Sequence, residues 1–238
     1  MPSPPSGGGR GPGKDGAPAA IFDLDGTLLD TLPDLHGSLN RALAAFGLPT
    51  HTLDGVRAMV GNGIARLVRD AAPADRRGEG FLGELKAAFK RDYASRQLEL
   101  TRPYPGVREL LDGLAGMGWP MAVLSNKDDD NSKAVVGHFF PGVFAAVLGA
   151  SPSRRPKPDT GGALEAAGIL GRAPGDVFYL GDGENDMKVA AECGFVPVGV
   201  GWGFRSAAQV RAAGAKAVIE RPGEFLGLWE GLRAPSTS

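Results

Sequence analysis

Short apolar segments that alternate with helical patterns restrict the fold of this chain more than any other feature of its sequence. Six of them, rich in Val, Ile and Phe, are predicted to be strands: residues 19–25, 121–126, 144–149, 177–182, 196–200 and 217–219. They are largely apolar throughout, which is typical of strands covered on both faces. Helical patterns separate them, the clearest at 107–117. This alternation predicts an α/β fold with a doubly wound parallel sheet.

The interval between the first two predicted strands is longer than a crossover requires. A parallel crossover needs about a dozen residues, and the helix at 107–117 supplies it, so about seventy residues are surplus. We predict an all-helical cap domain at residues 30–102, inserted into a Rossmann-like core made of residues 19–29 and 103–238. The surplus carries four helical stripes and no strand-like alternation: Leu35, Leu39, Leu43 and Phe46; Leu53, Val56 and Val60; Ile64, Leu67 and Val68; Phe81, Leu85, Phe89 and Tyr93.

Residues 1–18 are predicted to form a disordered tail. They contain 5 Pro and 6 Gly and no apolar run that could offset the entropy cost of ordering them. The sequence has no apolar stretch of roughly 7–15 residues placed as in a signal peptide, and no run of about 18 that could form a membrane helix. We therefore expect a cytoplasmic protein that has no membrane partner.

The composition excludes several other classes of protein. The chain has 26 basic and 27 acidic residues and a net charge of -1, so no excess of charge indicates nucleic acid as a partner. Its one cysteine, Cys193, excludes an intramolecular disulfide and multi-cysteine metal sites. The three histidines are scattered and show no ligand spacing.

Polar residues follow the predicted strands where each strand ends. Taken singly, each has a simple explanation, since an aspartate often caps a helix, Ser-Asn favours a turn and a lysine is usually solvated. The carboxyl ends of parallel strands, however, meet at one edge of a sheet, where ligands bind. We therefore expect these side chains to converge: Asp23, Asp25, Ser125, Asn126, Lys157 and Asp182, with Asp186 one turn into the helix behind Asp182.

Such a cluster brings at least four carboxylates to one place, and Lys157 is the only cation of these segments expected to point inward. The carboxylates would repel one another unless protons or a metal ion balanced them. Oxygen ligands without His or Cys favour Mg²⁺ over zinc or copper. A magnesium ion beside a lysine, a hydroxyl and amide donors is typical of a phosphate site.

Four segments together resemble the motifs of the haloacid dehalogenase superfamily of phosphotransferases. They are DLDGT, the strand ending in Ser125-Asn126, Lys157 within KPD, and GDGENDM. Further segments are similar, in order, to the phosphoglycolate phosphatase-like branch: FDLDGTLLDTLPDL, VGNG, SNK, HFFPGVFAAVLG and VGVGWGF. The resemblance covers residues 19–232. Gly183 and Thr160 depart from the residues common in the family, but neither removes a charged group.

The resemblance implies a role for each residue at the strand ends. Asp23 would be the nucleophile that forms an aspartyl phosphate, and Asp25 the general acid and base. Ser125 and Lys157 would hold the phosphoryl oxygens, helped by backbone N–H groups near Leu24 and Asn126. The Mg²⁺ ligands implied are Asp23, the backbone carbonyl of Asp25, Asp182 and Asp186, the last directly or through water.

The resemblance also implies a contact between the cap and the leaving group of the substrate. Gly61-Asn62-Gly63 lies between two helical stripes, where a turn is expected on structural grounds alone. In relatives, a loop at this place meets the leaving group. Backbone N–H groups of this loop could meet a small carboxylate, and Arg66, one turn later, could assist them.

The function implied is that of a Mg²⁺-dependent phosphatase that acts on a small phosphomonoester, with 2-phosphoglycolate, converted to glycolate, as the first candidate. A pyrophosphatase and a sugar-phosphate phosphatase or mutase have nearly the same signature and stay open. A binding module with a silent site is the alternative from another class, which the complete set of charged groups disfavours. Asp25 disfavours a dehalogenase, since dehalogenases lack that second aspartate. We expect a monomer or a homodimer.

Overall fold

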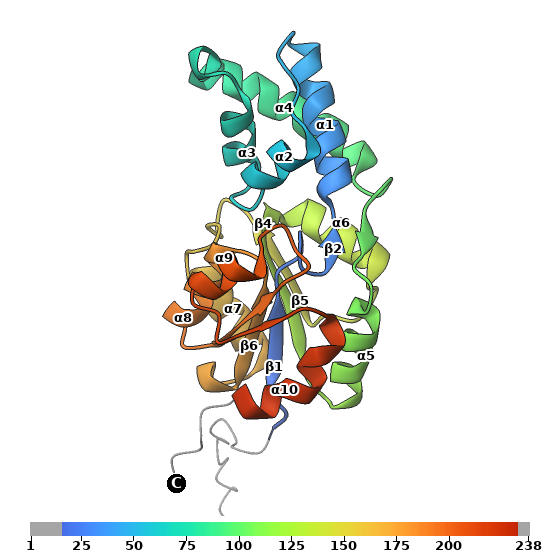
Figure 1. The fold of residues 1–238 in the computed structure, drawn as a ribbon, viewed down its shortest axis with the longest axis vertical. Coiled ribbons are helices and arrows are strands. Elements are labelled where there is room, and N and C mark those ends of the chain that lie inside the picture. The colour runs from blue at the N-terminus through green and yellow to red at the C-terminus, as the bar shows by residue number, and fades with distance from the viewer. Residues whose placement is uncertain (1–15, 233–238) are drawn as a thin grey trace, which may run out of the picture.

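The computed structural model describes residues 16–232, and a six-stranded parallel sheet forms its centre (Figure 1). The strand order is β5-β4-β1-β6-β7-β8, and every neighbouring pair is parallel. The predicted α/β class with a doubly wound sheet is therefore confirmed. The strands are β1 (Ala19–Phe22), β4 (Met121–Asp128), β5 (Ala146–Ala150), β6 (Val177–Gly181), β7 (Val196–Val200) and β8 (Ala217–Ile219).

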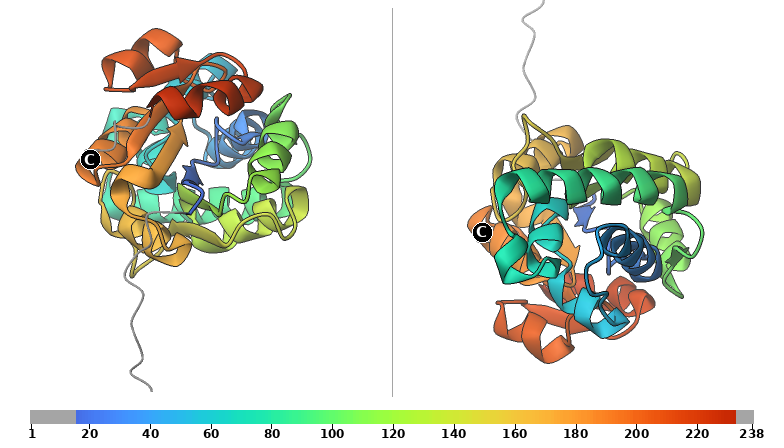
Figure 2. Two further views of the ribbon diagram at one scale, coloured as in Figure 1. Left: turned by 90° about the horizontal axis from the view of Figure 1, so that it is seen from below. Right: turned by 90° about the horizontal axis from the view of Figure 1, so that it is seen from above.

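Helices cover both faces of the sheet (Figure 1, Figure 2). The buried residues of β1 divide between these two faces. Ala20 and Phe22 belong to one buried cluster, and Ala19 and Ile21 to the other, because side chains alternate across a strand. The first cluster lies under α5 (Val107–Gly116), α6 (Asp129–Phe139) and α10 (Phe225–Leu232). The second lies under α7 (Gly161–Leu170) and α8 (Glu184–Glu192), and α9 (Ala207–Ala212) packs on β7 and β8.

Four helices lie above the carboxyl ends of the strands and form a hydrophobic cluster of their own (Figure 1). They are α1 (Leu32–Ala45), α2 (Leu53–Met59), α3 (Ile64–Ala71) and α4 (Glu79–Arg96). The predicted stripes supply most of this cluster, whereas Leu53 is 40% exposed. Short 3₁₀ helices lie at Ala74–Arg76, Pro174–Asp176 and Pro222–Glu224.

A two-stranded antiparallel ribbon joins the helical insertion to the rest of the chain. It pairs β2 (Leu29–Asp30) with β3 (Arg102–Pro103), and the sequence did not predict it because two-residue strands are too short to show alternation. The buried carboxylate of Asp34 fastens the ribbon to α1 by accepting the backbone N–H groups of Leu100 and Thr101. The two connections to the insertion therefore lie side by side.

The predicted disordered tail lies outside the described residues as far as residue 15. Its end is ordered, since Pro18 is buried and the carbonyl of Ala17 accepts a hydrogen bond from Nε of Arg172 at 2.6 Å. The structure thus differs from the prediction for these last residues. Their partner Arg172 lies 155 residues away along the chain, so no local pattern could have indicated the contact. Between residues 16 and 232, none of the helices combines the length and the apolar character needed to cross a membrane.

Candidate functional site

The DLDGT segment leaves β1 in a tight turn that places its first aspartate at the edge of the sheet. The N–H of Asp23 still bonds the carbonyl of Leu180 in the neighbouring strand β6, at 2.9 Å. Gly26 then has a φ of +87°, and a Cβ there would lie 2.5 Å from Oδ2 of Asp182. Only glycine combines that backbone conformation with that close approach.

Three of the predicted carboxylates converge at this edge. Asp23 follows β1, Asp182 follows β6 and Asp186 lies in the first turn of α8, and one carboxylate oxygen from each lies within 4.8 Å of the others. Asp182 accepts the N–H of Phe204 at 2.7 Å and the hydroxyl of Thr27 at 3.3 Å. These bonds fix the orientation of Asp182 toward the other two carboxylates.

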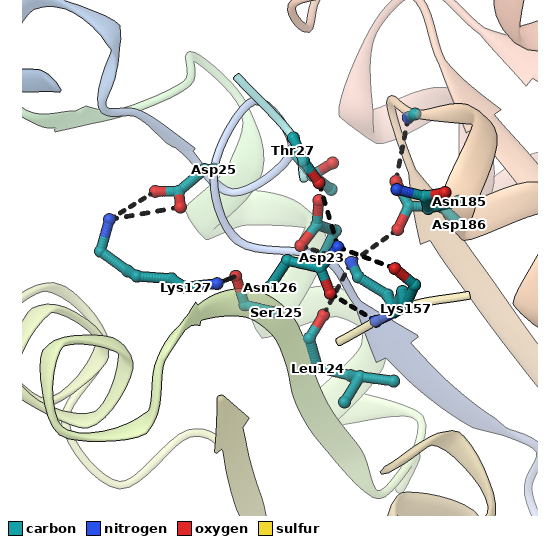
Figure 3. A network of polar contacts seen from close by, with 12 residues as sticks. Asp23, Asp25, Thr27, Leu124, Ser125, Asn126, Lys127, Lys157, Asn185 and Asp186 are labelled. Carbon is teal, nitrogen blue, oxygen red and sulfur yellow. Dashed lines mark hydrogen bonds and ion pairs between the residues drawn. The ribbon is translucent and has the colours of Figure 1, made fainter. Parts of the chain in front are cut away.

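Lys157 lies among these carboxylates with its side chain 3% exposed (Figure 3). Its Nζ is 2.8 Å from Oδ1 of Asp23 and 2.6 Å from Oδ1 of Asp186, and it also donates to the carbonyl of Leu124 at 3.1 Å. The predicted inward direction of Lys157 is therefore correct. The lysine holds the Asp23 carboxylate in one orientation.

The burial of these groups changes their acidity. Burial and then the charge of Asp186 raise the pKa of Asp23 well above its usual value, and the same two causes raise the pKa of Asp182 to about 7. Burial alone would lower the pKa of Lys157, but Asp186 and Asp23 outweigh it, so that the pKa is raised well above its usual value. The site therefore holds more negative charge than it can stabilise by itself.

A divalent cation fits this set of donors. Within residues 16–232, the ammonium of Lys157 forms ion pairs with two of these three carboxylates, Asp23 and Asp186, so the charges of the cluster are only partly balanced. The donors are all carboxylate oxygens, which suits Mg²⁺ or Ca²⁺ rather than zinc or copper. Asp23, Asp182 and Asp186 would hold the ion.

Ser125 and Asn126 lie near the end of β4 and are both buried. Asn126 joins three segments, because its side chain accepts the N–H of Lys157 at 2.6 Å and donates to the carbonyls of Lys157 and Gly61. The hydroxyl of Ser125 accepts the N–H of Lys127 at 3.2 Å and lines the space next to Asp23. The sequence predicted this convergence but not the fixing role of the Asn126 amide.

Asp25 points away from the three clustered carboxylates and toward Lys127 (Figure 3). Nζ of Lys127 is 2.9 and 3.2 Å from the two oxygens of Asp25 and donates to the hydroxyl of Tyr93, on α4, at 2.6 Å. Asp25 and Tyr93 outweigh the effect of burial and raise the pKa of Lys127. The expectation that Lys157 is the only inward cation is therefore wrong, because Lys127, next to Asn126, is equally buried.

The loop Gly61-Asn62-Gly63 lies over the strand ends and is held there by side chains of the sheet domain. Asn185 donates to the side chain of Asn62 at 2.9 Å, and Arg205 donates to the carbonyl of Val60 at 2.7 Å. Arg205 also bonds the carbonyl of Arg57 at 2.8 Å, at the end of α2. These contacts meet the free carbonyl groups that a helix end leaves.

Arg66 does not reach this place. Its side chain is 62% exposed and forms an ion pair with Asp70, four residues later on the same helix, at 2.7 Å. The buried face of α3 is taken by Ile64, Leu67 and Val68. The prediction for Arg66 is corrected, since the arginine that meets this loop is Arg205.

Two small cavities adjoin at Asp23 and Asp25, which line both. One of about 40 Å³ has mainly apolar walls from the helical insertion: Leu35, Val60, Ile64 and Leu67, with Tyr93, Ser125, Asn126 and Lys127 beside them. The other, of about 100 Å³, is polar and includes Lys157, Asp182, Asp186, Asn62 and Arg205. The arrangement suits a phosphoryl group at Asp23 with its leaving group in the apolar cavity.

Comparison with known families gives a match over most of the chain. A family model described as haloacid dehalogenase-like hydrolase matches residues 20–200. The phosphoglycolate phosphatase of Pseudomonas putida is 32% identical over 231 residues, which is 91% of this chain and 80% of that protein. The phosphoglycolate phosphatase of Rhodobacter capsulatus is 38% identical over 184 residues, 75% of this chain and 81% of that protein.

Solved structures give a similar result. A candidate phosphoglycolate phosphatase from Lactobacillus delbrueckii subsp. bulgaricus has a TM-score of 0.84 at 27% identity, over 92% of this chain and 100% of that chain. A predicted phosphoglycolate phosphatase from Haemophilus somnus has a TM-score of 0.82 at 27% identity, over 91% and 100%.

Proposed function

The chain belongs to the haloacid dehalogenase-like hydrolase family and is a phosphatase, and from this premise we propose that it hydrolyses a small phosphomonoester with Mg²⁺ through an aspartyl phosphate. The resemblance predicted from the four motifs is confirmed for the family. The observation that carries the proposal is the arrangement of Asp23, held by Lys157 at 2.8 Å beside two further carboxylates.

In the proposed first step, an oxygen of Asp23 attacks phosphorus and the bond from phosphorus to the alcohol oxygen breaks. Lys157 and Ser125 bind the phosphoryl oxygens, and Asp25 gives its proton to the leaving oxygen. In the second step, Asp25 takes a proton from the water that attacks the phosphoryl group, and Asp23 is released. Mg²⁺ bound by Asp23, Asp182 and Asp186 would neutralise charge on the phosphoryl oxygens.

The proposed substrate is 2-phosphoglycolate. The relatives named phosphoglycolate phosphatase support it, and so does the size of the apolar cavity beside Asp25. At about 40 Å³, this cavity has room for only a few water-sized groups at roughly 10–15 Å³ each. A two-carbon leaving group suits this volume better than a hexose does.

We propose that residues 30–102 act as a cap that selects the leaving group. Val60, Gly61 and Gly63 line the apolar cavity, so the loop between α2 and α3 would contact the alcohol that leaves phosphorus in the first step. We also propose a cytoplasmic location, which is in keeping with Cys193 as a buried free thiol.

Phosphate release from several substrates, with and without chelator, tests the proposal. The set is 2-phosphoglycolate, pyrophosphate, a hexose phosphate and 4-nitrophenyl phosphate. We expect the highest kcat/KM for 2-phosphoglycolate and no turnover after removal of Mg²⁺. A higher kcat/KM for pyrophosphate or the hexose phosphate would support the alternative enzymes, and turnover without metal would contradict the role given to the carboxylates.

Rapid-quench kinetics test the two aspartates separately. Asp25→Asn should lose about 10²–10⁴-fold on an alkyl phosphate, which needs a proton donor. With 4-nitrophenyl phosphate it should give a burst of nitrophenol and a phosphorylated protein, because the second step lacks its base. Asp23→Asn should give neither. Equal losses without a burst on both esters would assign Asp25 a structural role only.

A further inference from the structure

Lys127 and Tyr93 form a buried polar pair that the reaction steps above do not use. Lys127 belongs to β4 in the sheet domain, and Tyr93 to α4 in the helical insertion. Both line the small cavity next to Asp25, although the Lys127 side chain is only 2% exposed and Tyr93 is fully buried. A buried lysine and a buried tyrosine hydroxyl are costly to desolvate, so we asked what this pair could bind.

The hydrogen bonds of this pair leave one donor free. The ammonium of Lys127 donates to the two oxygens of Asp25 at 2.9 and 3.2 Å and to the hydroxyl oxygen of Tyr93 at 2.6 Å. Because Tyr93 accepts from the ammonium, its own O–H proton needs another acceptor. In residues 16–232 the structure gives it none, and burial raises the pKa of Tyr93 to about 12, so the hydroxyl keeps its proton as a donor.

Apart from Asp23 and Asp25, which also line this cavity and act on the phosphate ester in the proposed reaction, the surroundings of this donor pair favour a small anion. The other walls that the insertion contributes are aliphatic, from Leu35, Val60, Ile64 and Leu67, and Lys127 is the only cation among the residues that line this cavity in the described chain. An ion pair formed against apolar walls is stronger than one in water. A neutral alkyl group here would leave the phenol O–H without a hydrogen-bond acceptor, which would weaken its binding.

We propose that Lys127 and Tyr93 bind a carboxylate of the leaving group, so that the site selects phosphate esters of small hydroxy acids. This inference rests on the proposed function and specifies its substrate class. The phenol of Tyr93 would give the hydrogen bond, and the ammonium of Lys127, whose three N–H groups already bond Asp25 and Tyr93, would contribute its positive charge. The Lys127 ammonium, 2.9 Å from Asp25, would offset part of the repulsion between Asp25 and the bound carboxylate. Lys127 and Tyr93 come from different units, so a bound carboxylate also bridges the cap and the sheet domain.

Two esters that differ mainly in the carboxylate test the inference: 2-phosphoglycolate and ethyl phosphate. We expect the wild type to prefer 2-phosphoglycolate by at least tenfold in kcat/KM. Tyr93→Phe should reduce this preference by about tenfold, the usual effect of one hydrogen bond to a charged group. Lys127→Met, which keeps an unbranched side chain one atom shorter and removes the charge, should remove the preference. Tyr104→Phe and Lys133→Met are matched controls outside the cavity and should leave it unchanged.

Binding to the Asp23→Asn variant gives a readout without turnover. Calorimetric titration should show tighter binding of 2-phosphoglycolate than of ethyl phosphate, and the difference should shrink when Tyr93→Phe is added. If both variants lose the same factor on both esters, Lys127 and Tyr93 act only by positioning Asp25, and the inference is wrong. A wild type that hydrolyses 4-nitrophenyl phosphate and both alkyl esters without preference overturns the inference alone. A wild type inactive on every ester overturns the proposed function as well.

Discussion

Replacing Asp182, a proposed metal ligand, should make the metal-free protein more stable. Burial and the nearby Asp186 raise the pKa of Asp182 from 3.8 to about 7, so the folded state holds a proton there that the unfolded state has lost. The stability that this proton provides is complete below pH 4 and disappears as the pH rises through 7. Above pH 7 the folded protein must carry a buried charge.

The size of the effect follows from the change in pKa. A rise from 3.8 to about 7 corresponds to about 4 kcal/mol at 1.36 kcal/mol per pH unit. Asp182→Asn removes this penalty and keeps an oxygen that can accept the N–H of Phe204. After a discount for relaxation and for coupling to Asp186, we expect a gain of about 2–4 kcal/mol, or on the order of 10 °C in Tm for a chain of this size.

Thermal unfolding after treatment with chelator measures the gain in stability of the Asp182→Asn variant directly. At pH 8 the Asp182→Asn variant should melt higher than the wild type, and at pH 5 the difference should fall to less than half. Mg²⁺ should raise the Tm of the wild type and have little effect on the variant. Asp112→Asn, an exposed carboxylate on α5, is the control and should change neither. A variant that melts at or below the wild type at pH 8 without metal would falsify the reasoning.

Three further predictions concern the metal, the turn and the cap. Ca²⁺ should bind but support little turnover, because its higher coordination number lets both oxygens of Asp23 bind metal and misaligns the nucleophile; equal rates with Mg²⁺ would contradict this. Gly26→Ala should abolish turnover and weaken Mg²⁺ binding, since its Cβ would lie 2.5 Å from the Asp182 carboxylate; calorimetry checks this. Arg205→Ala should raise hydrogen exchange at residues 60–67 several-fold and raise KM more than it lowers kcat, because two bonds to α2 and its end are lost. Arg205→Lys should recover part of both, and unchanged exchange would show that the loop is held in another way.

The places where polar residues follow the strands could be predicted because the rule is local. A strand with apolar residues on both faces must lie inside a sheet, and parallel strands end at one edge. Asp23, Asp182 and Lys157 could therefore be placed together, and the structure has them in one cluster. The short ribbon at Leu29–Asp30 and Arg102–Pro103 carries no such pattern, since two residues cannot establish a period.

The amino-acid sequence by itself determined the class of fold and the polar residues that gather at the carboxyl ends of the strands, because periodicity and strand ends are properties of neighbours in the chain. Only the tertiary structure decided which side chains meet across the gap between insertion and sheet. Helical spacing correctly assigned Tyr93 to a buried stripe, but it says which face a residue lies on and not what its hydroxyl touches. Arg205 reaches Val60 across 145 residues, whereas Arg66, only three residues beyond Gly63, faces solvent. Such contacts depend on how two separately packed units dock, and no local pattern encodes that.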